Sequence, residues 1–151
     1  MSWLTGAEAR ALPSRETWRQ ETARLADEKR VWTGLSGAIL TGREVADHLG
    51  AAVARLERES WAPHDMRTFR SVGMALIDTA PGGAGDRDAR VVATRLLDLL
   101  VHVQAGAPGV CAFGAFDAWE GRAGRTWPEV KELLTTAAQF AREHGSQGGG
   151  R

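Results

Sequence analysis

The sequence contains one cysteine, Cys111, and no tyrosine, and lysine occurs only at Lys29 and Lys131. A single cysteine cannot form a disulfide within the chain, which excludes a disulfide-stapled fold and is typical of a reducing compartment. The other basic residues are arginines, and alanine and glycine are frequent. This bias favours a GC-rich genome, such as that of an actinobacterium, and carries no information about chemistry.

Long apolar runs are also missing from the chain. The most apolar stretch, residues 91–103, is interrupted by Thr94, Arg95, Asp98 and His102, and it falls short of a membrane span. The N-terminus lacks the basic region and apolar run of a signal peptide. The sequence therefore predicts a cytoplasmic protein without a membrane partner.

Neither sign of charge is in excess, because 19 basic and 19 acidic residues give a net charge of zero. A DNA-binding protein normally carries a basic surplus, so nucleic acid is not the expected partner. Residues 42–59 partly fit a helix-turn-helix motif, but the turn would consist of strong helix formers. Glu57 and Glu59 would also repel phosphate. A continuous helix is the better interpretation, and a DNA-binding regulator is the third choice of function.

The chain does have the composition of one globular domain and clear signals for helix ends. Its 151 residues, 43% of them hydrophobic and 25% charged, suffice for one core. In three places a threonine is followed three residues later by a glutamate, a capping box that predicts a helix N-terminus. The pairs are Thr5/Glu8, Thr41/Glu44 and Thr126/Glu129.

Apolar residues recur with helical spacing after these signals, and no segment alternates convincingly as a strand. The pattern predicts an all-α fold, a compact bundle of five or six helices with an N-terminal helical arm. Residues 1–40 would form the arm, residues 41–145 the helical core domain and residues 146–151 a disordered tail. The expected helices span about residues 5–12, 14–31, 42–60, 65–79, 86–104 and 127–144, with a short helix or 3₁₀ turn around Phe116.

Three short motifs lie in the predicted core domain, and they resemble those of a known family. The segment 53–61 has the pattern Val-x-x-Leu-x-x-Glu-x-Trp, residues 71–76 read Ser-Val-Gly-Met-Ala-Leu, and Trp119 is followed by Gly-Arg-Thr-x-x-Glu-Val at 124–130. In these motifs, between about residues 44 and 141, the chain resembles a family of small uncharacterised proteins of actinobacteria and their phages. The resemblance implies a shared fold and no particular activity.

The segment before the last helix is a candidate site for a small anionic ligand. Two guanidiniums, a hydroxyl and the free amides of a helix N-terminus could together hold a phosphate or carboxylate. An aromatic wall beside them could stack on a ring. The residues are Arg122, Arg125 and Thr126, with Phe113, Phe116 and Trp119 as the wall. The simpler interpretation is a capped helix, with Arg125 paired to a nearby carboxylate.

Metal and nucleophile chemistry find little support in the sequence. The four histidines and Cys111 lack the paired spacing of a zinc site, so we expect no metal and no cofactor. A nucleophile pair of Cys111 and His102 would lack a visible orienting group. Asp117 and Glu120 could divide acid and base roles, but such a pair is more often a solvated face or salt-bridged. The sequence therefore favours a protein that is not an enzyme, and it predicts no catalytic residue.

Six tryptophans make up a skewed aromatic set. Trp18 and Trp32 lie in the charged N-terminal part, where they either clamp the arm onto the body or form a partner surface, in which tryptophan is enriched. The favoured function is a non-enzymatic binding or accessory protein that binds a protein partner or self-associates as a homodimer through the arm. The alternative is a small helical enzyme or ligand-binding protein, with an anionic ligand near Trp119 and Arg125.

Overall fold

The computed structural model describes residues 15–105 and 114–147, and this part of the chain is all-α, as the sequence predicts. Within these residues there are isolated β-bridges but no strand. The helices are α2 (Arg15–Glu28), α3 (Gly42–Glu59), α4 (Val72–Asp78), α5 (Arg87–Ala105), α6 (Ala115–Glu120) and α7 (Trp127–His144).

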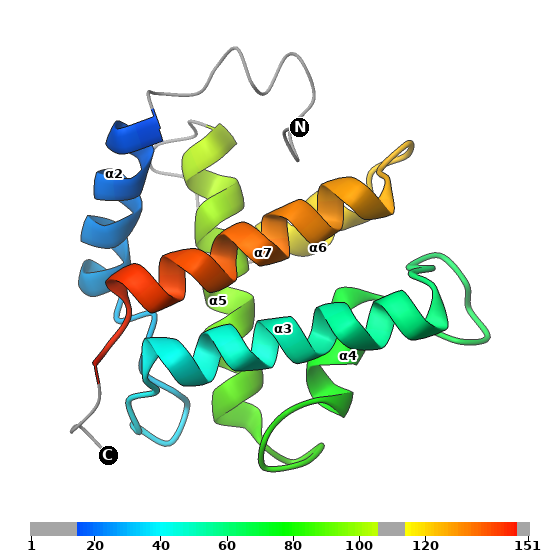
Figure 1. The fold of residues 1–151 in the computed structure, drawn as a ribbon, viewed down its shortest axis with the longest axis horizontal. Helices are drawn as coiled ribbons and strands as arrows, with labels where there is room; N and C mark the ends of the chain where they lie inside the picture. Colours follow the sequence, from blue (N-terminus) through cyan, green and yellow to red (C-terminus); the bar gives the residue numbers. More distant parts are fainter. Residues whose placement is uncertain (1–14, 106–113, 148–151) are drawn as a thin grey trace.

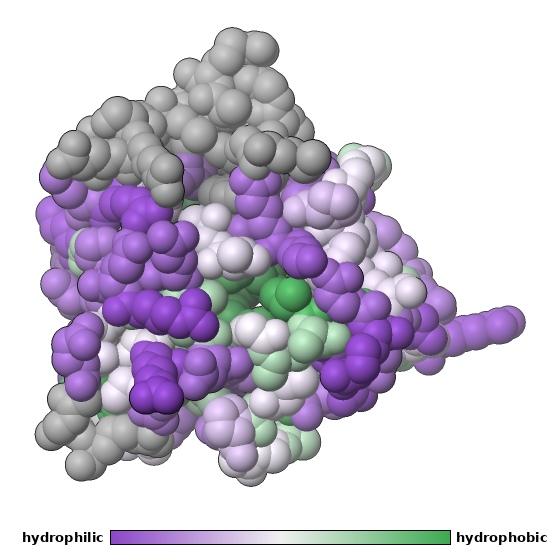
Figure 2. Space-filling model, in the orientation of Figure 1, coloured by the Kyte–Doolittle hydropathy of each residue, from purple (hydrophilic) through white to green (hydrophobic). Residues whose placement is uncertain are grey.

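Helices α3 and α7 lie side by side and run in opposite directions, and α5 crosses behind both of them (Figure 1). Helix α5 also contacts α2, α4 and α6, so it occupies the centre of the bundle. Figure 2 shows polar side chains over most of the face that α3 and α7 present, with apolar side chains in a hollow between them.

The core forms where the apolar stripes of these helices meet. The stripe that the sequence predicts on α5 is buried, as is the inner face of α7. Burying each of these large aliphatic side chains contributes about 1.5–3 kcal/mol to folding. The central members are Val92, Leu96, Leu99, Leu100, Val130, Leu133, Leu134 and Phe140.

Side-chain caps set where the helices begin. The capping boxes of Thr41 with Glu44 and of Thr126 with Glu129 are both formed, which confirms two of the three predicted pairs. The third pair lies outside the described residues. Asp86 accepts a hydrogen bond from the amide of Ala89 at 3.1 Å and so caps α5. The predicted continuous helix over residues 42–59 is also confirmed.

The start of α3 and the end of α7 cross at very close range. The amide of Gly42 donates to the carbonyl oxygen of Ser146 at 2.8 Å, and Thr41 forms a bridge with Ser146. A Cβ atom on Gly42 would lie 1.9 Å from the carbonyl oxygen of Ala141. Ser146, which the sequence analysis places in a disordered tail, therefore takes part in this crossing; residues 148–151 lie outside the described part.

One helix prediction is wrong over half its length. The sequence predicts a helix over residues 65–79, but α4 begins only at Val72, where the Ser71 hydroxyl accepts from the amide of Met74. Phe69 has a φ of 49°, which breaks a right-handed helix. Residues 60–71 instead form a loop that projects from the end of the bundle (Figure 1).

Candidate functional site

The arginine expected to bind an anion is used inside the protein. Arg125 is buried, and its Nε donates to the carbonyl oxygen of Trp119 at 2.9 Å. Its Nη1 pairs with the Glu129 carboxylate at 2.9 Å, and the guanidinium carbon lies 3.9 Å from the centroid of the Trp119 ring. The guanidinium thus joins α6 to α7, as in the simpler of the two sequence interpretations.

The other residues of that predicted site are hydrogen-bonded or packed within the protein, are exposed, or lie outside the described residues. The Thr126 hydroxyl accepts from the amide of Glu129, and the buried Phe116 ring packs on Trp119. Burial alone would raise the pKa of Glu129, but hydrogen bonds from Thr126 and the charge of Arg125 outweigh it and lower that pKa. Arg122 is exposed, and Phe113 lies outside the described residues. Phe116 and Trp119 are therefore part of the core packing rather than a ligand surface.

The two tryptophans expected at a partner surface lie in the core. The Trp18 and Trp32 rings are 8% and 7% exposed, and their centroids lie 6.5 and 6.4 Å from that of Phe140 on α7. Both rings therefore hold the N-terminal segment on the body, the first of the two alternatives. The partner-surface interpretation of this pair fails for a physical reason, because the rings leave almost no area for a partner to cover.

Glu120 is a buried carboxylate, whereas the sequence predicts it on a solvated face or in a salt bridge. Its neighbour Asp117 is exposed as expected, but the Glu120 side chain is 4% exposed. Its Oε2 accepts from the indole nitrogen of Trp61 at 2.8 Å and from the amide of Val72 at 2.9 Å. Burial raises the pKa of Glu120 against the opposing effect of both hydrogen bonds. Because α6 is a single short helix, no periodicity marks the residue as buried.

Asp98 is a second buried carboxylate, in the middle of α5. It accepts from the amide of Phe116 at 2.8 Å and from that of Gly114 at 3.3 Å, so it supplies the N-terminal cap that α6 lacks in its own sequence. Burial raises the pKa of Asp98 although both amides lower it. Both buried carboxylates thus serve to position α6 and the segments around it.

Replacing Asp98 with asparagine should remove a pH-dependent loss of stability. Because the pKa of Asp98 is raised above its ordinary 3.8, the folded state keeps the proton to higher pH than the unfolded state does. The stability of the parent relative to Asp98→Asn is therefore greatest below that ordinary pKa and falls as pH rises through the raised one. Urea unfolding of both proteins from acid to neutral pH measures this difference, and a gap that grows in favour of the parent with rising pH would contradict it.

The exposed apolar side chains gather on the projecting loop and the helix after it. Among the described residues, four large hydrophobic side chains are exposed, and three of them lie between positions 66 and 74. Met66 is 75% exposed, Phe69 48% and Met74 39%. A groove of about 490 Å³ runs between this segment and the C-terminal half of α3. We call the loop 60–71 the docking loop, and these three side chains with the groove the docking surface.

The backbone of the docking loop is ordered by hydrogen bonds at its base. The amide of Ala62 donates to the carbonyl oxygen of Arg70 at 2.9 Å, and the Arg70 guanidinium donates to the carbonyl oxygen of Glu59. The amide of Phe69 bonds to the carbonyl oxygen of Asp65 at 2.9 Å. Phe69 is thus held with a positive φ and a half-exposed ring, and strained residues of this kind cluster at functional sites.

Charge around the docking surface is unevenly distributed. Both carboxylates of the groove, Glu59 and Asp78, are paired with Arg55 at 3.0 and 3.4 Å. The side chains of Arg58 on the rim and Arg67 on the loop form no ion pair within residues 15–105 and 114–147, although the Arg67 amide donates to the Asp65 carboxylate at 2.9 Å. The rim therefore presents free positive charge beside exposed apolar side chains.

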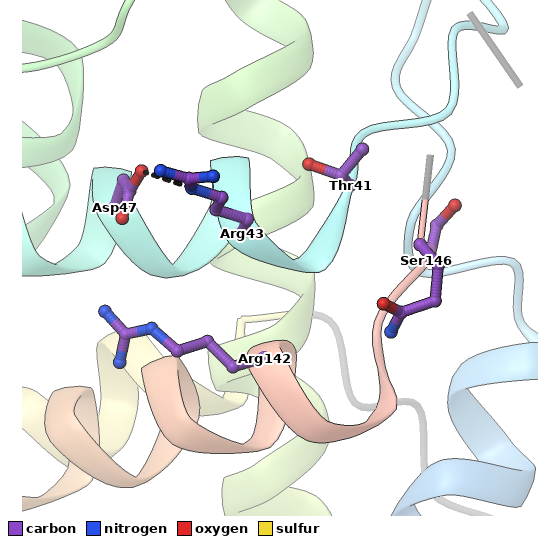
Figure 3. Close-up of a pocket in the computed structure, with 6 residues that line it drawn as sticks. Thr41, Arg43, Asp47, Arg142 and Ser146 are labelled. Atoms are coloured by element: carbon purple, nitrogen blue, oxygen red, sulfur yellow. Dashed lines mark ion pairs between the residues drawn. The ribbon is translucent and has the colours of Figure 1, made fainter. Parts of the chain in front are cut away.

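A second groove, of about 450 Å³, lies where α3 begins and α7 ends (Figure 3). Arg43 and Asp47 line it from α3, 4.0 Å apart, and Arg142 lines it from α7. These charged side chains are exposed. None of the exposed large hydrophobic side chains of the described residues lines this groove, so it is the weaker candidate.

The whole site lies in a segment that one protein family covers. The model of the family of unknown function DUF6197 matches residues 40–140. The chain belongs to this family. In this DUF6197 member the match includes α3 to α6, the docking loop, Asp98 and Glu120, whereas Trp18 and Trp32 precede it. Neither the search of curated proteins nor that of solved structures finds a match.

Metal-ligating side chains do not converge in the part of the DUF6197 member that the structure describes. No three His, Cys, Asp or Glu side chains there form a group that could hold a metal ion. His48 is buried with its Nε2 2.8 Å from the carbonyl oxygen of Leu76, and Cys111 lies outside the described residues. None of the described helices is long and apolar enough to cross a membrane.

Proposed function

We propose that this DUF6197 member is a non-enzymatic binding protein, and that its docking surface receives an acidic segment of a partner protein that carries a large apolar side chain. The single observation behind this proposal is that three of the four exposed large hydrophobic side chains among the described residues lie on the docking loop and the start of α4: Met66, Phe69 and Met74. Scattered exposed apolar residues are ordinary, but a contiguous group with a polar rim is typical of an interaction site.

The charge of the rim determines the chemistry of the partner. The guanidiniums of Arg58 and Arg67 form no ion pair among the described residues, so carboxylates on a bound segment could pair with them. Arginine pairs with carboxylates in a planar, two-pronged geometry that lysine does not provide. A basic segment would meet like charge, which costs affinity and excludes such partners.

Phe69 supplies the apolar anchor. Aromatic side chains dominate the energy of small interfaces, and the methionines beside the ring can adapt to the shape of a partner. Because the backbone at Phe69 is fixed by the loop, little conformational freedom is lost when a partner covers the ring. The groove between loop and α3 offers room for the apolar side chain of the partner.

Two finer expectations from the sequence accompany this proposal. The single cysteine supports binding in a reducing compartment such as the cytoplasm, and the arginine-rich composition supports an actinobacterial origin. A second copy of the chain is the competing occupant of the docking surface. The burial of Trp18 and Trp32 removes the observation on which a homodimer interface through the N-terminal arm was predicted.

Replacing Phe69 with asparagine should abolish binding and leave the fold intact. Asparagine tolerates a positive φ better than phenylalanine does, so the free energy of unfolding should stay within about 1 kcal/mol of the parent. A displayed library of random linear peptides, selected on the immobilised full chain, provides the probe. We expect acidic peptides with large apolar residues, bound about tenfold or more weakly by Phe69→Asn in fluorescence polarisation.

Two matched variants separate this site from the general surface. Leu35→Asn removes another exposed apolar side chain, outside the docking surface, and should bind as the parent does. Arg58→Glu should weaken binding, whereas Arg43→Glu, in the second groove, should not. Peptides that bind Phe69→Asn and the parent equally, or that are basic, would overturn the proposal. So would a chain that sediments as a dimer through Phe69 and selects no peptide.

A further inference from the structure

The carboxylate of Glu120 contacts both ends of the docking loop from outside the loop. Trp61, near its beginning, donates its indole N–H to Oε2 at 2.8 Å, and Val72, just after its end, donates its backbone amide to the same oxygen at 2.9 Å. Glu120 itself is the last residue of α6, which packs on α5. One buried oxygen thus joins the loop to the body.

The other hydrogen bonds of the loop base have a different effect. The bonds from Ala62 to Arg70 and from Arg70 to Glu59 close the loop upon itself and upon the end of α3. They do not determine where α4 starts relative to α6. Phe69 precedes α4 and Met74 lies on it. The hydrogen bond from the Val72 amide to Glu120 therefore fixes the backbone between these two side chains.

We propose that Glu120 is the positioning residue of the docking loop, and that it holds Phe69 and Met74 in the arrangement that receives the partner. This inference rests on the proposed function for the identity of the partner, but the positioning itself can be measured without one. Glu120 touches no partner, because its side chain is buried beneath the loop; it acts through Trp61 and Val72.

The positioning does not require a charge on Glu120. Both hydrogen bonds end on Oε2, so a proton on Oε1 leaves the acceptor in place. The charged groups that act on the carboxylate are Asp117 on its own helix and His64 in the loop. Because the amide oxygen of glutamine can accept the same two bonds, Glu120→Gln should preserve the loop, whereas Glu120→Ala removes the acceptor altogether.

Hydrogen exchange and peptide binding together test this positioning on the full chain. In Glu120→Ala we expect the amides of Ala62, Phe69 and Ser71 to exchange about tenfold faster than in the parent, since a buried hydrogen-bond partner is lost. The peptide selected on the parent should bind about tenfold more weakly. In Glu120→Gln both values should stay within about threefold of the parent.

Two controls separate positioning from a general loss of stability. Phe140→Leu disturbs the packing on Trp18 and Trp32 at the other end of α7 and should leave the loop amides protected. Trp61→Phe deletes the indole N–H but keeps the ring that packs on Trp127, so it reports on the loop should Glu120→Ala not fold. Unchanged loop exchange in Glu120→Ala or Trp61→Phe overturns the inference. Absence of any selected peptide overturns only the proposed function.

Discussion

Replacing Gly42 with alanine is expected to lower the free energy of unfolding by about 3 kcal/mol or to prevent folding. The added Cβ would lie 1.9 Å from the carbonyl oxygen of Ala141 and 3.1 Å from the Cα of Gly145, and both neighbours are backbone that cannot rotate away. To accept the methyl group, α3 and α7 must move apart. That movement would break the bond from Gly42 to Ser146 and loosen the largest helix-helix contact of the fold.

Gly50 provides the matched control because it lies two turns further along the same helix. A Cβ there meets no atom of the described residues within 4 Å. Alanine in an exposed helix interior is favoured over glycine by about 0.5–1 kcal/mol, so Gly50→Ala should stabilise the protein. Urea unfolding followed by tryptophan fluorescence measures both variants. Equal stability of Gly42→Ala and the parent would mean that the two helices do not cross as closely as described.

Helix ends were the most predictable feature of the fold, because their signals are local. A threonine hydroxyl and a glutamate three residues later satisfy amides within a single turn, so Thr41/Glu44 and Thr126/Glu129 need no distant partner. The buried stripes of α5 and α7 were predictable for a related reason, since their periodicity persists over several turns.

The docking loop could not be predicted because distant residues determine it. Met66, Phe69, Val72 and Leu76 have helical spacing, which is why the sequence predicts a helix there. In the structure the first two side chains face solvent and the last two are buried. The hydrogen bond from the Val72 amide to Glu120 spans nearly fifty residues, and no pattern in either segment predicts it.

The local sequence does not show which charged side chains the fold buries. Glu120, predicted on a solvated face or in a salt bridge, is buried, and Arg125, predicted either to bind an anion or to pair with a nearby carboxylate, pairs with Glu129 and joins α6 to α7. Both outcomes have one cause: a charged side chain is buried only with partners, and those partners come from the tertiary fold. The tryptophans show the same effect, because Trp18 and Trp32 pack on a ring more than one hundred residues later in the chain.

Arg125→Ala tests which of the two interpretations of that arginine is correct. We expect the free energy of unfolding to fall by about 3 kcal/mol, because the variant deletes a buried partner of Glu129 and the cation above the Trp119 ring. Arg125→Lys should restore only part of this, since one ammonium cannot reach the Trp119 carbonyl and the Glu129 carboxylate with the fork geometry of a guanidinium. The exposed Arg122, replaced with alanine, is the control and should change stability by less than about 1 kcal/mol.

Inorganic phosphate distinguishes a structural guanidinium from one that binds anions. A ligand that binds only the folded state raises its stability as the ligand concentration increases. If Arg125 held an anion, phosphate would stabilise the parent more than a chloride solution of equal ionic strength, and Arg125→Ala would lose that response. We expect no such difference, because the Glu129 carboxylate already pairs with the Arg125 guanidinium at 2.9 Å and the Trp119 ring covers one face of that guanidinium. A phosphate-specific stabilisation that requires Arg125 would instead restore the anionic-ligand function and argue against a role confined to packing.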